Sequence, residues 1–348
     1  MKKLFCCLLS VALLLGGLVG CSAREKKYEK TWFEWFDTFS TLTVYTDSEE
    51  TFDTYAALCA SYLEDYHELL DIYHDYEGIH NLKTVNDRAG ETVEIDPRLG
   101  DFLRFAQDVD ALTQHHTNVG MGRVTALWHQ AREAANADPK QAALPDKGAL
   151  QIALAHTELD RMVLSDDDRT VCLTDPEMAL DGGALGKGYV ARLIAQALIE
   201  KGCDSFLLNL GGNTVAHGEK PGGSPWLVGI ESPDKGIAYD SSIRLEGRAL
   251  VTSGSYQRYF TVDGVRYHHI VDPDSGYPEN RFLSVSVLCP DSALADALST
   301  ALFSMTEEEG RALLETVEED VEALWITADG GIRTTDGWSD HVYEGGAS

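Results

Sequence analysis

Tyr267-His-His-Ile-Val-Asp-Pro-Asp-Ser-Gly276 is the stretch of this 348-residue chain that indicates most about its fold and chemistry. An apolar run ends here at Asp272-Pro273, a pair typical of a strand running into a turn. His269 stands near the end of that strand, where an imidazole can take a proton from an incoming hydroxyl at neutral pH. A partly buried, hydrogen-bonded histidine is the alternative. His268 alternates to the opposite face of the strand and is the less suitable base.

Working outward from this stretch, Asp263-Gly264 lies between two strand-like pairs and predicts a hairpin. Apolar spacing predicts helices mainly in the first half, over residues 51–73, 99–112, 150–154 and 187–201. Strand-like runs dominate the second half, at 205–210, 226–230, 249–252, 258–262 and 283–288. This distribution predicts an α+β fold of layered antiparallel or mixed sheets with packed helices, and argues against a doubly wound parallel sheet. Residues 133–148 and 218–225 are expected to be surface segments.

A further helix is predicted over Asp291–Met305, with Asp296 and Thr300 one turn apart. Residues at this spacing share one helix face, so a carboxylate and a hydroxyl can point at the same cation. Oxygen ligands with places left for phosphate and water suit magnesium. A solvated helix edge or a local hydrogen bond is the alternative for this pair.

A glycine-rich turn, Asp181-Gly-Gly-Ala-Leu-Gly-Lys-Gly188, precedes the predicted helix at 187–201. Its glycines permit close approach of a ligand to the backbone, and a helix N-terminus favours phosphate groups. The spacing is neither that of a P-loop nor that of a dinucleotide fingerprint. A turn that is tight for structural reasons alone is the alternative.

The first residues describe an export signal. Lys2 and Lys3 precede an apolar run that reaches Leu18-Val-Gly-Cys21, and this run is short for a membrane span. The ending resembles a bacterial lipobox, so Cys21 is expected to carry lipid and to hold the protein on the extracytoplasmic face of the cell membrane. An ordinary signal peptide is the alternative. We expect residues 1–20 to be the signal, 21–31 a tether and 32–348 a single large domain.

Composition excludes some classes of function. The formal net charge of -29 repels nucleic-acid phosphates, so nucleic-acid binding is not expected. An anionic ligand must therefore meet a metal ion or a local cluster of basic groups. Cys59, Cys172, Cys203 and Cys289 are widely spaced without a Cys-x-x-Cys pair, which indicates neither a zinc site nor a disulfide scaffold.

Five segments, in this order, resemble the ApbE-type FAD:protein FMN transferases: DGGALGKG (181–188), NLGGN (209–213), VTSGSY (251–256), HHIVDPDSGYP (268–278) and ADALSTALF (295–303). The resemblance extends back to Phe36-Asp-Thr38, where the family commonly has Met-Gly-Thr, and to Asp71-Ile-Tyr73. It implies a T-fold-like domain and a secreted or lipid-anchored enzyme. Such an enzyme splits FAD with Mg2+, transfers FMN to a threonine or serine hydroxyl of an exported acceptor protein, and releases AMP.

Carried over by position, the resemblance implies that Asp296, Thr300 and the main-chain oxygen of Ala184 ligate the magnesium. It implies that His269 is the base and that Asp181 and Lys187 line the FAD site. The residues implied to cradle the flavin and adenine parts of FAD are Phe36, Tyr73, Thr117, Asn118, Val119 and Ile270. Tyr73 is the natural stacking surface.

Two other functions stay open. The same residues with water as nucleophile make an FAD diphosphatase that gives FMN and AMP. A lipoprotein that only binds flavin is the third possibility, although binding alone requires neither His269 nor the pair Asp296 and Thr300.

Overall fold

A computed structural model describes residues 25–231, 241–256 and 258–343. Its centre is an eight-stranded sheet in the order β1-β2-β6-β7-β10-β13-β14-β15, and each neighbouring pair in it is antiparallel. The strands are β1 (Lys26–Trp32), β2 (Ser40–Thr46), β6 (Phe206–Leu210), β7 (Asn213–His217), β10 (Ala249–Gly254), β13 (Phe282–Cys289), β14 (Glu322–Thr327) and β15 (Ile332–Thr334).

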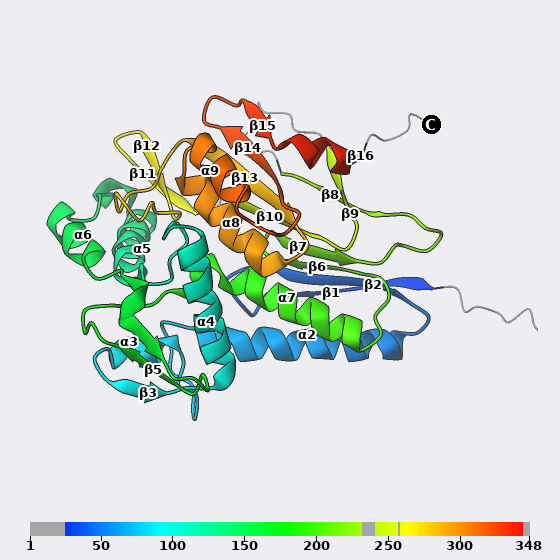
Figure 1. The fold of residues 1–348 in the computed structure, drawn as a ribbon, viewed down its shortest axis with the longest axis horizontal. Helices are drawn as coiled ribbons and strands as arrows, with labels where there is room; N and C mark the ends of the chain where they lie inside the picture. Colours follow the sequence, from blue (N-terminus) through cyan, green and yellow to red (C-terminus); the bar gives the residue numbers. More distant parts are fainter. Residues whose placement is uncertain (1–24, 232–240, 257, 344–348) are drawn as a thin grey trace, which may run out of the picture.

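Three helices, α2 (Glu49–Leu70), α7 (Gly186–Glu200) and α8 (Ser292–Ser304), lie across one face of this sheet (Figure 1). The N-terminus of α2 is capped by the Ser48 side chain, which accepts the Thr51 amide. In α8 every residue except Thr300 is buried. The short helix α9 (Glu307–Leu314) follows α8 and begins with a capping box made by Thr306 and Glu309.

A small second sheet, in the order β16-β9-β8, covers the other face of the main sheet. It consists of β8 (Trp226–Gly229), β9 (Ser242–Leu245) and β16 (Val342–Tyr343). Trp226 and Ile243 from this sheet pack with Leu288 and Ile326 of the main sheet, and Trp338 of the 3-10 helix η5 (Asp336–His341) joins them. The centre of the molecule is therefore a helix layer, a large sheet and a small sheet.

A helical region lies beside the main sheet, at the left of Figure 1. It contains α3 (Leu82–Asp87), α4 (Pro97–Leu112), α5 (Gly122–Ala137) and α6 (Lys147–Leu154), with the 3-10 helices η2 (Pro139–Gln141) and η3 (Leu159–Arg161). The sheet β3-β5-β4 and the hairpin β11-β12 belong to this region, and their strands are β3 (Thr92–Glu94), β4 (Met162–Leu164), β5 (Thr170–Leu173), β11 (Tyr259–Val262) and β12 (Val265–His268). Trp128 of α5 packs on Phe260 and Tyr267 of the hairpin.

The predicted α+β layers of antiparallel sheets and packed helices are confirmed. The hairpin at Asp263-Gly264 is present, with positive φ at both residues (50° and 81°), as a type I′ turn requires.

Two boundary predictions need correction. Residues 133–137, expected in a surface segment, form the last turns of α5. The main sheet also begins inside the expected tether, because Lys26–Trp32 pairs with β2 as an edge strand and buries Trp32. The signal, Cys21 and the rest of residues 1–24 lie outside the described residues. No helix in the described ranges has the length and apolarity needed to cross a membrane.

Candidate functional site

The glycine-rich turn and α8 meet at Gly188 and Asp296. The Gly188 amide donates to Oδ2 of Asp296 at 2.8 Å, and the Ser292 hydroxyl donates to the Gly188 carbonyl at 2.9 Å. Gly188 lies in the first turn of α7, whose amides have no acceptor one turn back within the helix. A Cβ at position 188 would lie 2.3 Å from the Asp296 Cβ, so only glycine allows the two helices to come this close.

Asp296 is a buried carboxylate that needs compensating positive groups. Burial raises the pKa of Asp296, whereas the Lys187 charge, the Gly188 amide and the Asn213 side chain lower it. Asn213, on β7, is itself buried, and its Oδ1 has no hydrogen-bond partner among the described residues. A buried acceptor oxygen without a partner can receive a hydrogen bond or a cation.

Ala184 and Thr300 belong to elements that adjoin this junction. Ala184 ends the 3-10 helix η4 (Gly182–Ala184), which contacts α8. Thr300 follows Asp296 by one turn and is the half-exposed residue of α8. Asp296 and Thr300 therefore share a face of α8, and η4, which ends at Ala184, contacts this helix. Among the described residues there is no cluster of three or more His, Cys, Asp or Glu side chains suited to a metal. The predicted set contains a single carboxylate.

His268 is the last residue of β12 and His269 follows it, and the two histidines have different environments. His268 is buried, donates from Nε2 to the Glu279 carbonyl at 2.7 Å and accepts the Ile270 amide at Nδ1. Burial lowers the pKa of His268 to about 4, so this ring is neutral and structural. His269 is exposed to solvent.

The pKa of His269 is also lowered. The first cause is the number of protein atoms around the ring, and the Arg258, His268 and Lys187 charges act in the same direction. Because Lys187 acts on both His269 and Asp296, the predicted base and the predicted cation site lie near one shared cation.

Asp181 organises the turn before η4. Its Oδ1 accepts the Gly183 amide at 2.9 Å and its Oδ2 accepts the Thr125 hydroxyl at 2.8 Å. Tyr73 is 57% exposed, and its ring lies 5.6 Å from that of His129. Burial of part of the ring raises the pKa of Tyr73, and the Asp181 charge adds to this while Arg132 opposes it. Tyr73 therefore presents an accessible aromatic face, with the Asp181 and Arg132 charges nearby.

The other predicted flavin or adenine contacts are less accessible. Thr117 and Val119 are buried, and the Thr117 hydroxyl donates to the Ala297 carbonyl on α8 at 2.7 Å. Ile270 is buried as well. Asn118 donates to the Thr157 carbonyl and accepts the Gly120 amide, so both ends of its amide are occupied. Thr117 joins its segment to the helix that carries Asp296 and Thr300.

Phe36 packs edge-on against His67 with ring centroids 5.7 Å apart. Both Phe36 and Asp37 have positive φ, 58° and 48°. Aspartate tolerates this conformation better than most residues, which suits position 37, where the family commonly has glycine.

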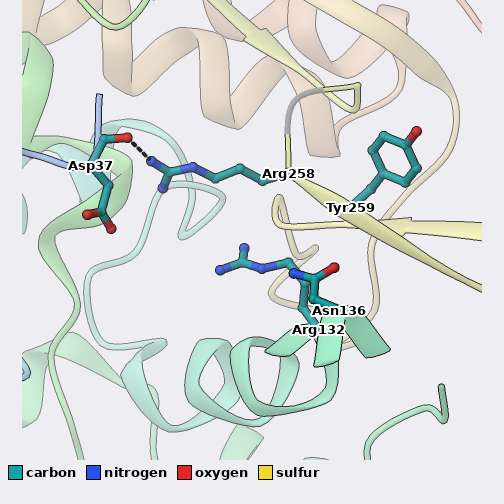
Figure 2. Close-up of a pocket in the computed structure, with 5 residues that line it drawn as sticks. All are labelled: Asp37, Arg132, Asn136, Arg258 and Tyr259. Carbon is teal, nitrogen blue, oxygen red and sulfur yellow. Dashed lines mark hydrogen bonds between the residues drawn. The ribbon is translucent and has the colours of Figure 1, made fainter. Parts of the chain in front are cut away.

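Sequence reasoning missed a cavity of about 350 Å3 lined by Asp37, Arg132, Asn136, Arg258 and Tyr259 (Figure 2). Arg132 and Asn136 come from α5, whereas Arg258 immediately precedes β11. In Figure 2 both guanidinium groups point into the cavity, and Arg258 Nη2 donates to the Asp37 carbonyl at 3.2 Å. The available signal in the sequence was Arg258, a basic residue at the start of a strand-like run and twelve positions before Ile270.

Comparisons with known proteins identify similar sequences and a similar fold. The sequence model of the ApbE family matches residues 36–325. The chain is 36% identical to an FAD:protein FMN transferase of Treponema pallidum (strain Nichols) over 278 residues, 75% of this chain and 74% of that protein. It is 32% identical over 260 residues to an FAD:protein FMN transferase of Klebsiella pneumoniae (strain 342), 71% of this chain and 78% of that protein. The fold is similar to the crystal structure of the ApbE protein from Thermotoga maritima, with a TM-score of 0.80, 26% identity, and coverage of 92% of this chain and 100% of that one.

Proposed function

The chain belongs to the ApbE family, and on this premise we propose that it is an FAD:protein FMN transferase. In the proposed reaction FMN moves from FAD to a threonine or serine hydroxyl of an exported acceptor protein, with Mg2+ as cofactor. The observation that carries the proposal is the junction of Gly188, Asp296 and η4, with Lys187 acting on both Asp296 and His269.

The residues at this junction fit a magnesium ion. The Asp296 carboxylate, the Thr300 hydroxyl and the Ala184 carbonyl are hard oxygen donors, the type that Mg2+ prefers. The Asn213 side chain interacts with Asp296, and its Oδ1 has no hydrogen-bond partner among the described residues. When bound there, Mg2+ supplies charge neutralisation for the diphosphate of FAD.

His269 is the proposed general base. Its lowered pKa keeps the imidazole neutral and able to accept a proton. The acceptor hydroxyl oxygen forms a bond to the phosphorus of the FMN half, and its proton passes to His269. The phosphoanhydride bond to AMP breaks and AMP leaves with that bond's electron pair. Bound phosphates bring negative charge to the ring and so favour the imidazolium that forms.

Lys187 and Tyr73 have positioning roles in this proposal. Lys187 provides a fixed cation near the reacting phosphates, which lowers the energy of negative charge that develops there. The accessible face of Tyr73 provides a stacking surface for an aromatic ring of FAD. Asp181 holds the Gly183 amide and so fixes the turn from which Ala184 presents its carbonyl.

Hydrolysis of FAD by the same residues is the second candidate, because His269 is open to solvent and water can take the place of the acceptor hydroxyl. The two reactions share every group except the nucleophile.

We also propose that Cys21 is lipidated and that the enzyme works on the extracytoplasmic face of the cell membrane, where exported acceptors are found. The lipobox-like ending at Leu18-Val-Gly-Cys21 supports this location. Metabolic labelling with a fatty acid, compared between the natural chain and Cys21→Ala, tests it. Equal labelling of both proteins would show that Cys21 does not carry the lipid.

Incubation with FAD, Mg2+ and a co-expressed exported flavoprotein tests the function. Mass spectrometry distinguishes an FMN adduct on a threonine from free FMN and from unchanged FAD. Asp296→Ala is expected to abolish the magnesium-dependent turnover. If Asp296→Ala keeps the full magnesium response, the cation is not held at this junction.

A further inference from the structure

The carboxylate of Asp71 is buried at the end of α2 and accepts four hydrogen bonds. Its Oδ1 accepts the amides of Tyr73 at 2.6 Å and His74 at 3.2 Å. Its Oδ2 accepts the Tyr76 hydroxyl and Nδ1 of His74, each at 2.9 Å. An aspartate that accepts amides two and three residues later is a common way to close a turn. Here all four donors lie in the short segment that contains Tyr73.

Asp71 keeps its charge in this environment. Burial raises the pKa of Asp71, but the hydrogen bonds from Tyr73, His74 and Tyr76 outweigh burial, so the pKa is lowered. The carboxylate is therefore ionised at neutral pH. Hydrogen bonds to a charged acceptor are stronger than those between neutral groups, so the turn after α2 is held firmly.

The same turn is held from its far side by α3. The Lys83 amide, in the first turn of α3, donates to the Asp71 carbonyl at 3.0 Å. Asn81 is fully buried, donates from Nδ2 to the His74 carbonyl at 2.9 Å and caps α3 by accepting the Thr84 amide. The backbone on both sides of Tyr73 is thus fixed by buried polar groups, without a contribution from the Tyr73 ring.

The Tyr73 side chain depends on this backbone for its position. Tyr73 is 57% exposed, so packing confines its ring less than that of a core residue. Its nearest aromatic neighbours are His129, at 5.6 Å between ring centroids, and His74, at 6.5 Å. The Asp181 charge acts on Tyr73, which places the ring near the turn expected to line the FAD site. A group that is fixed before its ligand arrives loses less entropy on binding.

We propose that Asp71 is a positioning residue for FAD, which it does not touch. By holding the Tyr73 and His74 amides and the Tyr76 hydroxyl, it keeps the Tyr73 ring where it can stack on an aromatic ring of FAD. This inference rests on the stacking role of Tyr73 in the proposed function.

The test is a double-mutant cycle on FAD binding, measured by fluorescence titration of the full chain with Mg2+ present. It compares the natural chain, Asp71→Ala, Tyr73→Ala and the variant with both changes. Each single change is expected to weaken FAD binding roughly tenfold. The double variant is expected to bind FAD about as well as Tyr73→Ala, because Asp71 acts through that ring. In Asp71→Ala the KM for FAD should rise while the rate of FMN transfer at saturating FAD stays close to that of the natural chain.

Asp75→Asn is the matched control. It changes a carboxylate of the same turn whose side chain is 74% exposed and pairs with Lys83 at 3.2 Å, and it should bind FAD as the natural chain does. Tyr76→Phe removes one of the four donors and should cause a smaller loss than Asp71→Ala. If urea unfolding shows that Asp71→Ala does not fold, Asp71→Asn, which keeps an acceptor for the two amides, takes its place in the cycle.

Three results would overturn the proposal. One is unchanged FAD binding in the Asp71 variant, and another is unchanged FAD binding in Tyr73→Ala. The third is a double variant in which the two losses multiply, since Asp71 would then act on FAD binding independently of Tyr73. The cycle is read from FAD binding alone. Failure of the natural chain to place FMN on the flavoprotein would instead refute the transferase function.

Discussion

Gly188→Ala is the substitution whose outcome depends most directly on the α7–α8 junction. A Cβ at this position would lie 2.3 Å from the Asp296 Cβ, 2.5 Å from the Ser292 carbonyl oxygen and 3.0 Å from Asp296 Oδ2. An ordinary contact begins at 3.4 Å, so α8 must move by roughly 1 Å relative to α7. The neighbouring atoms belong to a helix backbone and a short side chain, which cannot turn away.

Two opposing contributions set the stability of this variant. Helix propensity alone favours alanine over glycine by about 1 kcal/mol. Overpacking of a buried contact costs about 1–3 kcal/mol, with loss of the Gly188-to-Asp296 hydrogen bond adding about 1 kcal/mol. We expect a net loss of about 1–3 kcal/mol from the free energy of unfolding. Because a displacement of about 1 Å moves Asp296 out of position, we also expect the turnover rate at limiting Mg2+ to decrease roughly a hundredfold.

Two other glycines provide a graded control. At Gly229 in β8 a Cβ meets nothing within 4 Å, whereas at Gly186 it would lie 3.0 Å from the flexible end of Leu70. Urea unfolding and the magnesium dependence of FMN transfer should therefore worsen in the order Gly229→Ala, Gly186→Ala, Gly188→Ala. If Gly188→Ala matches Gly229→Ala in both measurements, Asp296 is not fixed by this contact and the account of the site is wrong.

Two further predictions concern the histidine pair. His269→Ala should slow FMN transfer while FAD binding, measured by fluorescence titration, survives; a normal transfer rate in this variant would remove the base assignment. For the buried His268 the ring pKa is about 4 in the fold and about 6.5 in the unfolded chain, so the unfolded chain takes up the extra proton first. The neutral ring makes its full contribution to the free energy of unfolding above about pH 6.5. This contribution falls by about 1.4 kcal/mol per pH unit as the pH drops towards 4. Urea titrations between about pH 7 and pH 5 give the change of the free energy of unfolding with pH, and this change should be smaller in His268→Gln. An unchanged pH dependence would show that His268 does not titrate as described.

Helices and strands with strong periodicity were predictable from the sequence. The pattern of Leu294, Leu298 and Leu302 predicted α8, and the Asp263-Gly264 pair predicted the hairpin. The shared face of Asp296 and Thr300 followed from helix geometry alone. These features depend on residues close in sequence, where local patterns suffice.

Features made by distant segments were not predictable in the same way. The role of Gly188 depends on a contact with Asp296, more than a hundred residues later. Helix α5 gave a weak pattern because much of its buried side is covered by the hairpin β11-β12 and by α6, and Trp128 packs on residues from that hairpin. The arginine cavity joins α5 to the residue before β11, so neither segment indicates it alone.

The burial of α8 on all sides but one has a consequence for how this protein can be regulated. Thr300 is the half-exposed residue of a helix that is otherwise enclosed. Amide hydrogens of such a helix exchange with solvent only when most of the molecule opens. Asp296 and Thr300, the proposed magnesium ligands on α8, therefore cannot be displaced by melting a small part of the chain.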